Sequence, residues 1–213
     1  MLSCFAHTRS KLVASDHLRV RFGAITREFG VVDPLQGEVG DLFDQTFACA
    51  NSDAQYRSNR LQPGALPIEW SFSETELDAL RFEFQPFDPT LAGEERRRRT
   101  VGVVARIVEG YHNSDLAERF KLAVQSVSAE EPTLNFGAFV GLVQRPRCKY
   151  EFKIYVECDP KDPMLSTREL SDIAGAAPHF VSVSVGASAV SQRIYYICRD
   201  GLRTMDLEAV CAA

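Results

Sequence analysis

Three stretches of the chain carry a cationic side chain among alternating polar and apolar residues. The cations are Arg81, Lys153 and Arg193, and two of them are followed two residues later by a tyrosine, Tyr155 or Tyr195. Arginine forks and lysine ammonium groups are the usual protein ligands of phosphate. Tyrosine donates a hydrogen bond through its hydroxyl and can shield a cation with its ring. These residue types predict a site that binds an anion and stabilises positive charge beside it.

A carboxylate, Glu69, lies in an earlier stretch of the same kind. Opposite a cluster of cations, it could accept a proton or orient a donor group. The same residues also have a structural interpretation. Glu69 can pair with Arg81 across two strands, and Lys153 can pair with Glu83 or Glu157. The tyrosines are good strand formers in their own right, and the remaining arginine can be a surface residue.

The elements that must position these residues are strands. Side chains alternate between the two faces of a strand, and strict alternation predicts a half-buried one. Six such runs pair into three antiparallel hairpins: 67–73 with 80–85, 136–143 with 149–157, and 179–185 with 192–198. We expect one apolar face packed under helices, including Trp70, Phe82, Phe84, Phe152, Ile154 and Ile194. The opposite, polar face would carry the candidate site residues.

Helical periodicity and stop signals predict helices between the hairpins. The predicted ranges are 8–29, 41–50, 92–111, 115–128, 166–176 and 203–211. Ser114 or Asp115 is the predicted N-cap of the fourth helix, and Ser166 with Glu169 forms a capping box in the fifth. The arginine run 96–99 is typical of a solvated helix face.

Length and composition bound the class of protein. A chain of 213 residues allows one domain, 1–213, with an N-terminal helical segment over 1–64 and three helix and hairpin repeats over 65–213. A formal net charge of -5 argues against broad nucleic-acid binding. No apolar run approaches the ~20 residues of a membrane span. The six scattered cysteines and the lack of a signal peptide favour a cytoplasmic protein. The predicted fold class is α+β, with a meandering antiparallel sheet and helices packed outside it.

These stretches resemble the aromatic prenyltransferases of the dimethylallyltryptophan synthase type. The resemblance rests on P-I-E-W-S-F-S at 67–73, L-R-F-E-F-Q at 80–85, and the later K-I-Y and R-I-Y return strands. That family folds as an ABBA barrel of repeated α-β-β-α units, whose lumen holds a prenyl diphosphate and an aromatic acceptor. The resemblance covers roughly residues 66–199 and implies a partial or closed barrel of this type.

The resemblance also implies roles for the candidate residues. Glu69 would be the catalytic carboxylate that binds the acceptor. Arg81, Lys153 and Arg193 would bind the diphosphate, while Tyr155 and Tyr195 would shield the allylic cation. Tyr195 stands where the family has a lysine. The chain lacks an aspartate-rich D-D-x-x-D run, so we expect no essential metal and no cofactor beyond the prenyl diphosphate substrate.

The length of the chain leaves several alternatives open. The family barrel has five repeats, whereas this chain has three, and six strands leave a cramped lumen if they close. A second copy or a partner chain could complete the barrel, or the gene product could be longer. The chain could also be a non-catalytic ligand-binding or assembly protein of the same fold. We therefore expect a metal-independent prenyltransferase of secondary metabolism, with an indole-like or phenol-like acceptor, or a shortened relative that only binds.

Overall fold

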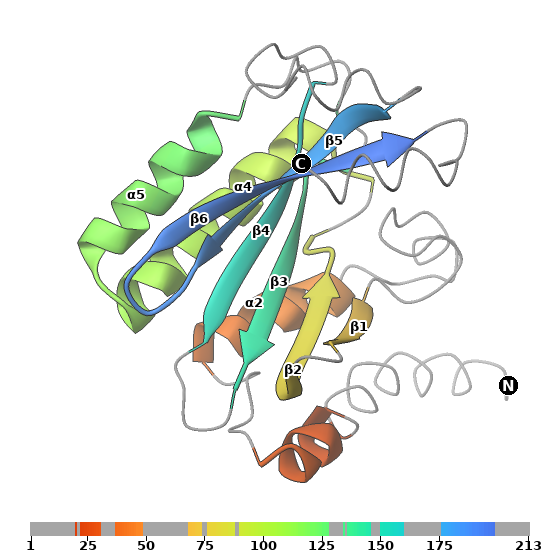
Figure 1. Ribbon diagram of the computed structural model, residues 1–213, viewed down its shortest axis with the longest axis vertical. Coiled ribbons are helices and arrows are strands. Elements are labelled where there is room, and N and C mark those ends of the chain that lie inside the picture. Colours follow the sequence, from red (N-terminus) through yellow and green to blue (C-terminus); the bar gives the residue numbers. More distant parts are fainter. Residues whose placement is uncertain are drawn as a thin grey trace, which may run out of the picture.

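A six-stranded antiparallel sheet lies at the centre of the computed structural model (Figure 1). The described residues are 20, 22–30, 37–48, 68–73, 76–87, 90–127, 134, 136–145, 150–159 and 176–198. Strand order equals chain order, so the sheet is a simple meander. The strands are β1 Ile68–Ser73, β2 Glu76–Phe84, β3 Ala138–Gln144, β4 Glu151–Glu157, β5 Ala176–Val185 and β6 Val190–Cys198. The predicted α+β class and meandering antiparallel sheet are confirmed, and among the described strands the sheet is open, with β1 and β6 at its edges.

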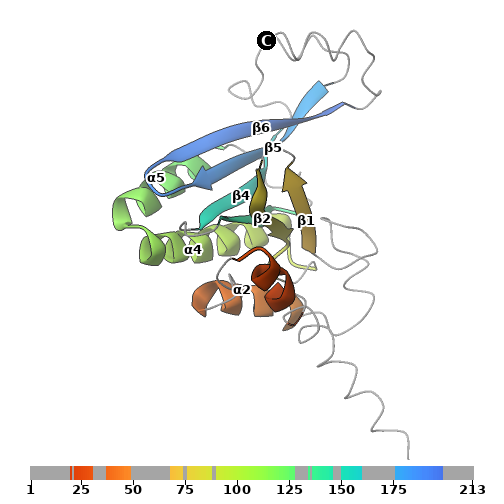
Figure 2. The ribbon, with the colours of Figure 1, turned by 60° about the horizontal axis from the view of Figure 1, so that its bottom comes forward.

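One face of the sheet is covered by helices (Figure 2). They include α2 Gly37–Ala48, α4 Gly93–Tyr111 and α5 Ser114–Gln125, together with helical residues 22–28. The predicted apolar residues lie on this face. Phe82, Phe84, Phe152 and Ile154 are at most 1% exposed, and Trp70 and Ile194 pack against the core as partly buried residues. Burial of each large side chain stabilises the fold by roughly 1.5–3 kcal/mol, so this face holds the sheet and helices together.

The predicted helices over 41–50, 92–111 and 115–128 are confirmed in type, and their ends differ by a few residues. α2 begins at Gly37, four residues before the predicted start at 41. α5 is capped by Asn113, whose side chain accepts a hydrogen bond from the Leu116 amide at 2.8 Å. The predicted caps, Ser114 and Asp115, lie inside the helix instead, because Asn113 has the extended backbone that a cap requires.

The arginine run on α4 is not a solvated face throughout, and that prediction is wrong for its first half. Arg96 is only 1% exposed, and its guanidinium donates to the Phe136 carbonyl at 2.9 Å and the Leu91 carbonyl at 2.7 Å. Arg97 donates to the carbonyl of Val127 at 2.6 Å. Both side chains therefore connect α4 to neighbouring backbone.

Several predictions fall outside the described residues. These are the helix over 203–211, the segment 51–64, the first part of the helix over 8–29 and most of the helix over 166–176. The last residue of that helix, Ala176, instead begins β5, which starts three residues before the predicted strand. Among the described residues, none of the helices has both the length and the apolar character that crossing a membrane requires.

Candidate functional site

The candidate site residues share the sheet face opposite the described helices, which we call the open face. The strand register shows which face each side chain lies on, because directly paired residues point to the same side of the sheet. The register places six predicted residues on this open face: Glu69, Arg81, Lys153, Tyr155, Arg193 and Tyr195. Their side chains therefore project away from the apolar core. The functional roles assigned to them stay predictions.

Lys153 lies at the centre of this face, between two tyrosine rings. Its Nζ donates a hydrogen bond to the Tyr195 hydroxyl at 2.9 Å. The same atom lies 4.6 Å from the centroid of the Tyr155 ring and 5.4 Å from that of Tyr195. The two rings are 5.6 Å apart. The distance to Tyr155 falls within the range of cation–π attraction, whereas the hydrogen bond places the ammonium at the hydroxyl edge of Tyr195, so both tyrosines stabilise the positive charge in different ways.

The structural alternatives drawn from the sequence can be compared with the strand register. Glu69 lies opposite Glu83, and Arg81 lies opposite Ser71, so Glu69 and Arg81 are diagonal neighbours on the same face instead of a directly opposed pair. The charge of Lys153 acts on the Glu83 carboxylate across Gly141, as one of these alternatives expects. Glu157 is buried and accepts the backbone amides of Phe136 and Gly137 at 3.0 and 3.2 Å. That carboxylate therefore holds the loop before β3.

A second contact joins β4 to β2 across the strand between them. The Tyr155 hydroxyl donates to a carboxylate oxygen of Glu83. Gly141 of β3 lies between the two, paired with both Glu83 and Lys153. A Cβ atom at Gly141 would lie 3.2 Å from the Tyr155 ring and 3.5 Å from the Glu83 side chain. The missing side chain at this position is what lets the tyrosine ring lie across β3.

Glu83 and Gly141 are members of the site that the sequence-based prediction missed. A glycine inside an otherwise apolar strand is a recognised sign of close approach by another group. Glu83 stands on the polar side of the run 80–85, beside the predicted Arg81. Nothing in a single sequence pairs it with a tyrosine 72 positions further along the chain.

Burial, hydrogen bonds and neighbouring charges shift the pKa values of three groups in the site, and not all in the same direction. Burial raises the pKa of Glu83, and Glu69 adds to this, while the Tyr155 hydrogen bond and the Lys153 charge oppose it. Burial and the hydrogen bond to Glu83 raise the pKa of Tyr155. Burial alone would also raise the pKa of Tyr195, but the hydrogen bond and the charge of Lys153 lower it below the ordinary tyrosine value. Two neighbouring phenols are thus shifted in opposite directions.

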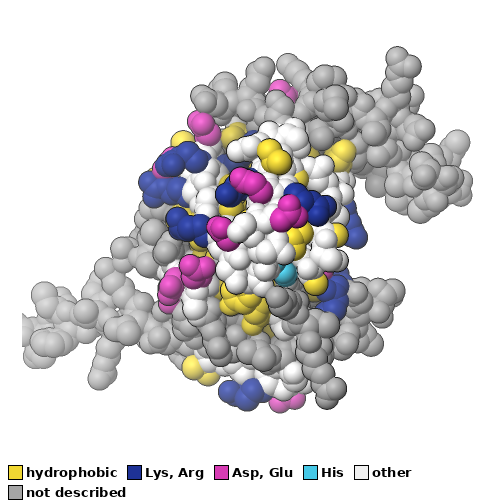
Figure 3. Space-filling model, turned by 90° about the vertical axis from the view of Figure 1, so that its left-hand side faces the viewer, with side chains coloured by type: hydrophobic (Ala, Val, Ile, Leu, Met, Phe, Trp, Pro, Cys, Tyr) yellow, Lys and Arg dark blue, Asp and Glu magenta, His cyan; other side chains and the backbone are white. Residues whose placement is uncertain are grey.

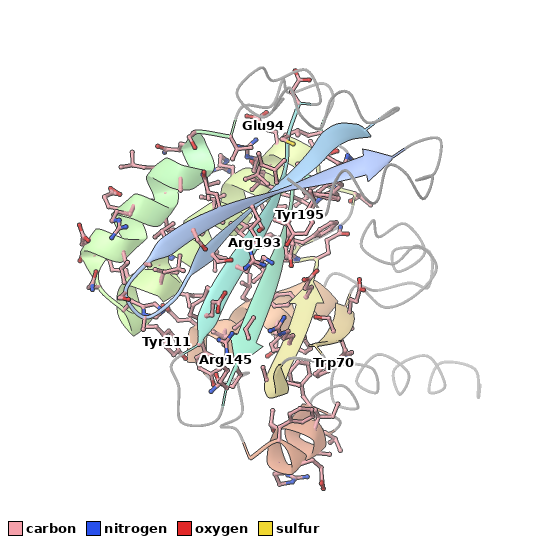
Figure 4. The ribbon with its side chains drawn as sticks, viewed as in Figure 1. Trp70, Glu94, Tyr111, Arg145, Arg193 and Tyr195 are labelled. Carbon is pink, nitrogen blue, oxygen red and sulfur yellow. The ribbon has the colours of Figure 1, made fainter. Side chains whose placement is uncertain are left out.

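The two arginines flank this cluster. Arg81 lies two residues before Glu83 on β2, and Arg193 lies two residues before Tyr195 on β6, opposite Ser182. Figure 4 shows Arg193 and Tyr195 close together along β6. Neighbouring strands are about 4.8 Å apart, so strands four places apart on a flat sheet are about 19 Å apart. Arg81 and Arg193 could therefore contact one ligand only where the sheet curves.

The helical side of the molecule is chemically different. A groove of about 640 Å³ runs between α4 and α5, with Arg97, Arg98 and Lys121 among its lining residues. Figure 3 shows acidic and basic side chains interspersed on this side. Arg98 pairs with Glu95 at 2.7 Å. Local pairing of this kind leaves little charge to attract a ligand.

Neither a metal-binding group in the described part of the chain nor a match to known proteins identifies the site. Within the described residues, no three or more His, Cys, Asp or Glu side chains gather into a group that could hold a metal ion. No model of a known protein family matches the chain, and no curated protein matches it in sequence.

Proposed function

We propose that this chain is a metal-independent aromatic prenyltransferase, which moves a prenyl group from an allylic diphosphate to an indole-like or phenol-like acceptor. The observation that carries the proposal is the position of the Lys153 ammonium between the rings of Tyr155 and Tyr195. An allylic diphosphate presents an anion joined to a carbon that becomes cationic. The lysine can bind the diphosphate anion, and the aromatic rings beside it can stabilise the allylic cation.

The reaction begins with heterolysis of the carbon–oxygen bond of the allylic diphosphate. The diphosphate leaves with the electron pair, and its charge is met by Lys153, with Arg193 and Arg81 on either side. The allylic cation left behind lies against the faces of Tyr155 and Tyr195. Electrostatic stabilisation of this kind acts where charge develops in the transition state, so it lowers the barrier to ionisation.

The acceptor then supplies electrons from its ring. A new carbon–carbon bond forms between the allylic carbon and a ring carbon, and the ring becomes aromatic again when that carbon loses its proton. Glu69 lies at the β1 end of the polar row that also contains Glu83 and Lys153. From there its carboxylate would accept a hydrogen bond from an indole N–H or a phenol O–H and hold the acceptor against the cation.

A second function is favoured by the openness of the sheet. Among the described strands, β1 and β6 are not paired with each other, and the Arg193 side chain is exposed. Water quenches allylic cations, so an uncovered face suits binding better than turnover. The alternative is a non-catalytic protein that holds a diphosphate ligand or a partner on this face.

Calorimetric titration with dimethylallyl diphosphate, with and without EDTA, tests the proposal. We expect binding that Lys153→Ala weakens by about tenfold to a hundredfold, as for loss of a hydrogen bond to a charged group. Lys121→Ala is the matched control, because it removes an ammonium from α5, where Lys121 pairs with Glu118 at 3.4 Å. Equal affinities in the two variants would refute the proposal.

Product formation separates the two functions. Mass spectrometry after incubation with an indole acceptor should detect a prenylated product that disappears in Glu69→Ala. Binding without product, even at high chain concentration, would favour the non-catalytic alternative.

A further inference from the structure

The Tyr195 hydroxyl oxygen accepts a hydrogen bond from a cation. Lys153 Nζ donates to it at 2.9 Å, and this hydrogen bond and the lysine charge both lower the pKa of Tyr195. The Tyr155 hydroxyl donates its hydrogen bond to Glu83. Ser182 is fully buried on β5, where it lies between Tyr155 of β4 and Arg193 of β6 in the register. The Lys153 ammonium of β4 is thus the donor in contact with the phenol oxygen, and Ser182 of β5 is a diagonal neighbour of Tyr195 on the same face.

The charged and titratable groups on this face favour a negative oxygen at Tyr195. Lys153 is the cation in direct contact, and Arg193 stands two residues away on β6. Glu83 is held by Tyr155, and Glu157 is engaged with the backbone of the loop before β3. The charged and titratable groups that share this face with Tyr195 are Glu83 on β2, Lys153, Tyr155 and Glu157 on β4, and Arg193 on β6.

We propose that Tyr195 is the proton acceptor of this site, with Lys153 as its positioning residue, and that its oxygen takes the ring proton of the prenylated acceptor. The identity of that proton rests on the proposed function, whereas the pairing of oxygen and ammonium does not. The pKa shifts support the assignment, because the pKa of Tyr155 is raised and that of Tyr195 is lowered. Of two neighbouring phenols, the one with the lower pKa loses its proton more readily and can then act as the base.

The step balances as follows. After the allylic carbon bonds to the acceptor ring, the ring carries the positive charge and an sp³ carbon with one hydrogen. The phenolate oxygen of Tyr195 forms an O–H bond to that hydrogen, and the broken C–H bond returns its electron pair to the ring. Tyr195 is then a neutral phenol, which passes its proton to solvent before the next turnover. The ring face of Tyr195 shields the cation, while its oxygen accepts the proton.

Ultraviolet absorbance at rising pH tests the pair without any substrate. The full chain has six tyrosines, and each adds tyrosinate absorbance when it ionises. We expect one tyrosine of the six to ionise ahead of the others in the native chain. Tyr195→Phe should abolish this early step. Lys153→Met should delay it into the main transition, since the ammonium no longer favours the phenolate.

Two further variants show whether the early ionisation depends on the contact between Lys153 and Tyr195. Lys153→Arg keeps a cation and should keep the early step, which covers the case in which Lys153→Met does not fold. Arg193→Gln removes an exposed charge from the same strand and should also keep it. The absence of an early step in the native chain, or its persistence in Tyr195→Phe, would overturn the inference.

Diphosphate binding distinguishes failure of this inference from failure of the proposed function. Tyr195→Phe keeps the ring, so it should bind dimethylallyl diphosphate within about twofold of the native chain and lose product formation. Normal binding without an early ionisation would overturn only the proton-acceptor role. An early ionisation without diphosphate binding would instead overturn the link to prenyl transfer.

Discussion

Glu83 couples the site to pH. Burial and the facing Glu69 raise its pKa in the folded state above the ordinary value of 4.5. The folded chain therefore keeps a proton on Glu83 at pH values where the unfolded chain has lost it. The stability that this group contributes is fully present below the unfolded pKa and is lost as pH rises through the folded one.

Glu83→Gln should therefore be more stable than the native chain at neutral pH. Glutamine keeps a carbonyl oxygen that can accept the Tyr155 hydroxyl, and it removes the repulsion with Glu69. We expect a gain of up to about 1 kcal/mol at neutral pH, since the group is only partly buried. The gain should vanish below about pH 4. Urea unfolding at both pH values measures it, and a gain that is the same at both would contradict the electrostatic explanation.

Gly141 controls the position of the Tyr155 ring. The nearest contact of an added Cβ would be that ring, at 3.2 Å, and the larger side chain of valine would crowd it further. Gly141→Val should displace Tyr155 and weaken dimethylallyl diphosphate binding by about tenfold, while strand propensity keeps the fold stable. The control is Gly102→Ala on α4, where an added Cβ would meet nothing within 4 Å. An affinity unchanged by Gly141→Val would show that the ring position is unimportant for binding.

At the scale of elements, Arg96 joins the first turn of α4 to the loop that enters β3. Its guanidinium donates to the backbone carbonyls of Leu91, just before the helix, and of Phe136, in the loop before β3. Arg96→Met would fill part of the volume and leave both acceptors without this donor. The Phe136 carbonyl also accepts the Ala138 amide and so keeps one donor. Hydrogen bonds from a charged group contribute about 1.5–3 kcal/mol each, so we expect a loss of about 3 kcal/mol in the free energy of unfolding.

Arg99→Met is the matched control from the same arginine run. Its side chain is 47% exposed and pairs with Glu95 at 2.6 Å. An exposed ion pair of this kind contributes less than about 1 kcal/mol. Urea unfolding of both variants makes the comparison. Similar losses in the two would mean that burial does not distinguish the arginines.

The strands and the side each residue faces could be predicted from the sequence, but the contacts between distant elements could not. Alternation with period two fixes the faces, and this placed Phe82, Ile154 and Lys153 correctly. The burial of Arg96 was missed because a run of four arginines gives no sign of which one faces the sheet. Its spacing of eight from the apolar Val104 was the available signal, because residues four and eight apart lie on one helix face.

The site shows the same division between local and distant information. The six predicted residues share one face because alternation is a local property of each strand. The contact of Tyr155 with Glu83 depends on β3 lying between β2 and β4 and on the glycine at 141. Pairing across an intervening strand is a property of the assembled sheet, so hairpin signals do not contain it. The cap at Asn113 was misplaced by one residue, which is the usual uncertainty of a helix boundary.

At the scale of the whole molecule, β1 and β6 form the two edges of the sheet among the described strands. β6 has nine residues, and Arg193 is its one charged residue. Edge strands that are long and carry few charges tend to pair with another chain. An uncovered site would also expose an allylic cation to water. Both considerations point to association of copies through the edge near Arg193, which would cover the open face.

Self-association should therefore accompany activity. We expect the isolated monomer to have weak or no turnover, and sedimentation or light scattering to show dimers as concentration rises. Ser191→Lys adds a charge to exposed β6 and should weaken this association, because charged edge residues oppose strand pairing. Ser188→Lys is the matched control: it adds the same charge in the exposed connection between β5 and β6. Turnover should fall with association in the first variant and persist in the second. A strictly monomeric chain with robust prenyl transfer in the presence of EDTA would contradict this prediction, because the open face would then need no second chain to exclude water.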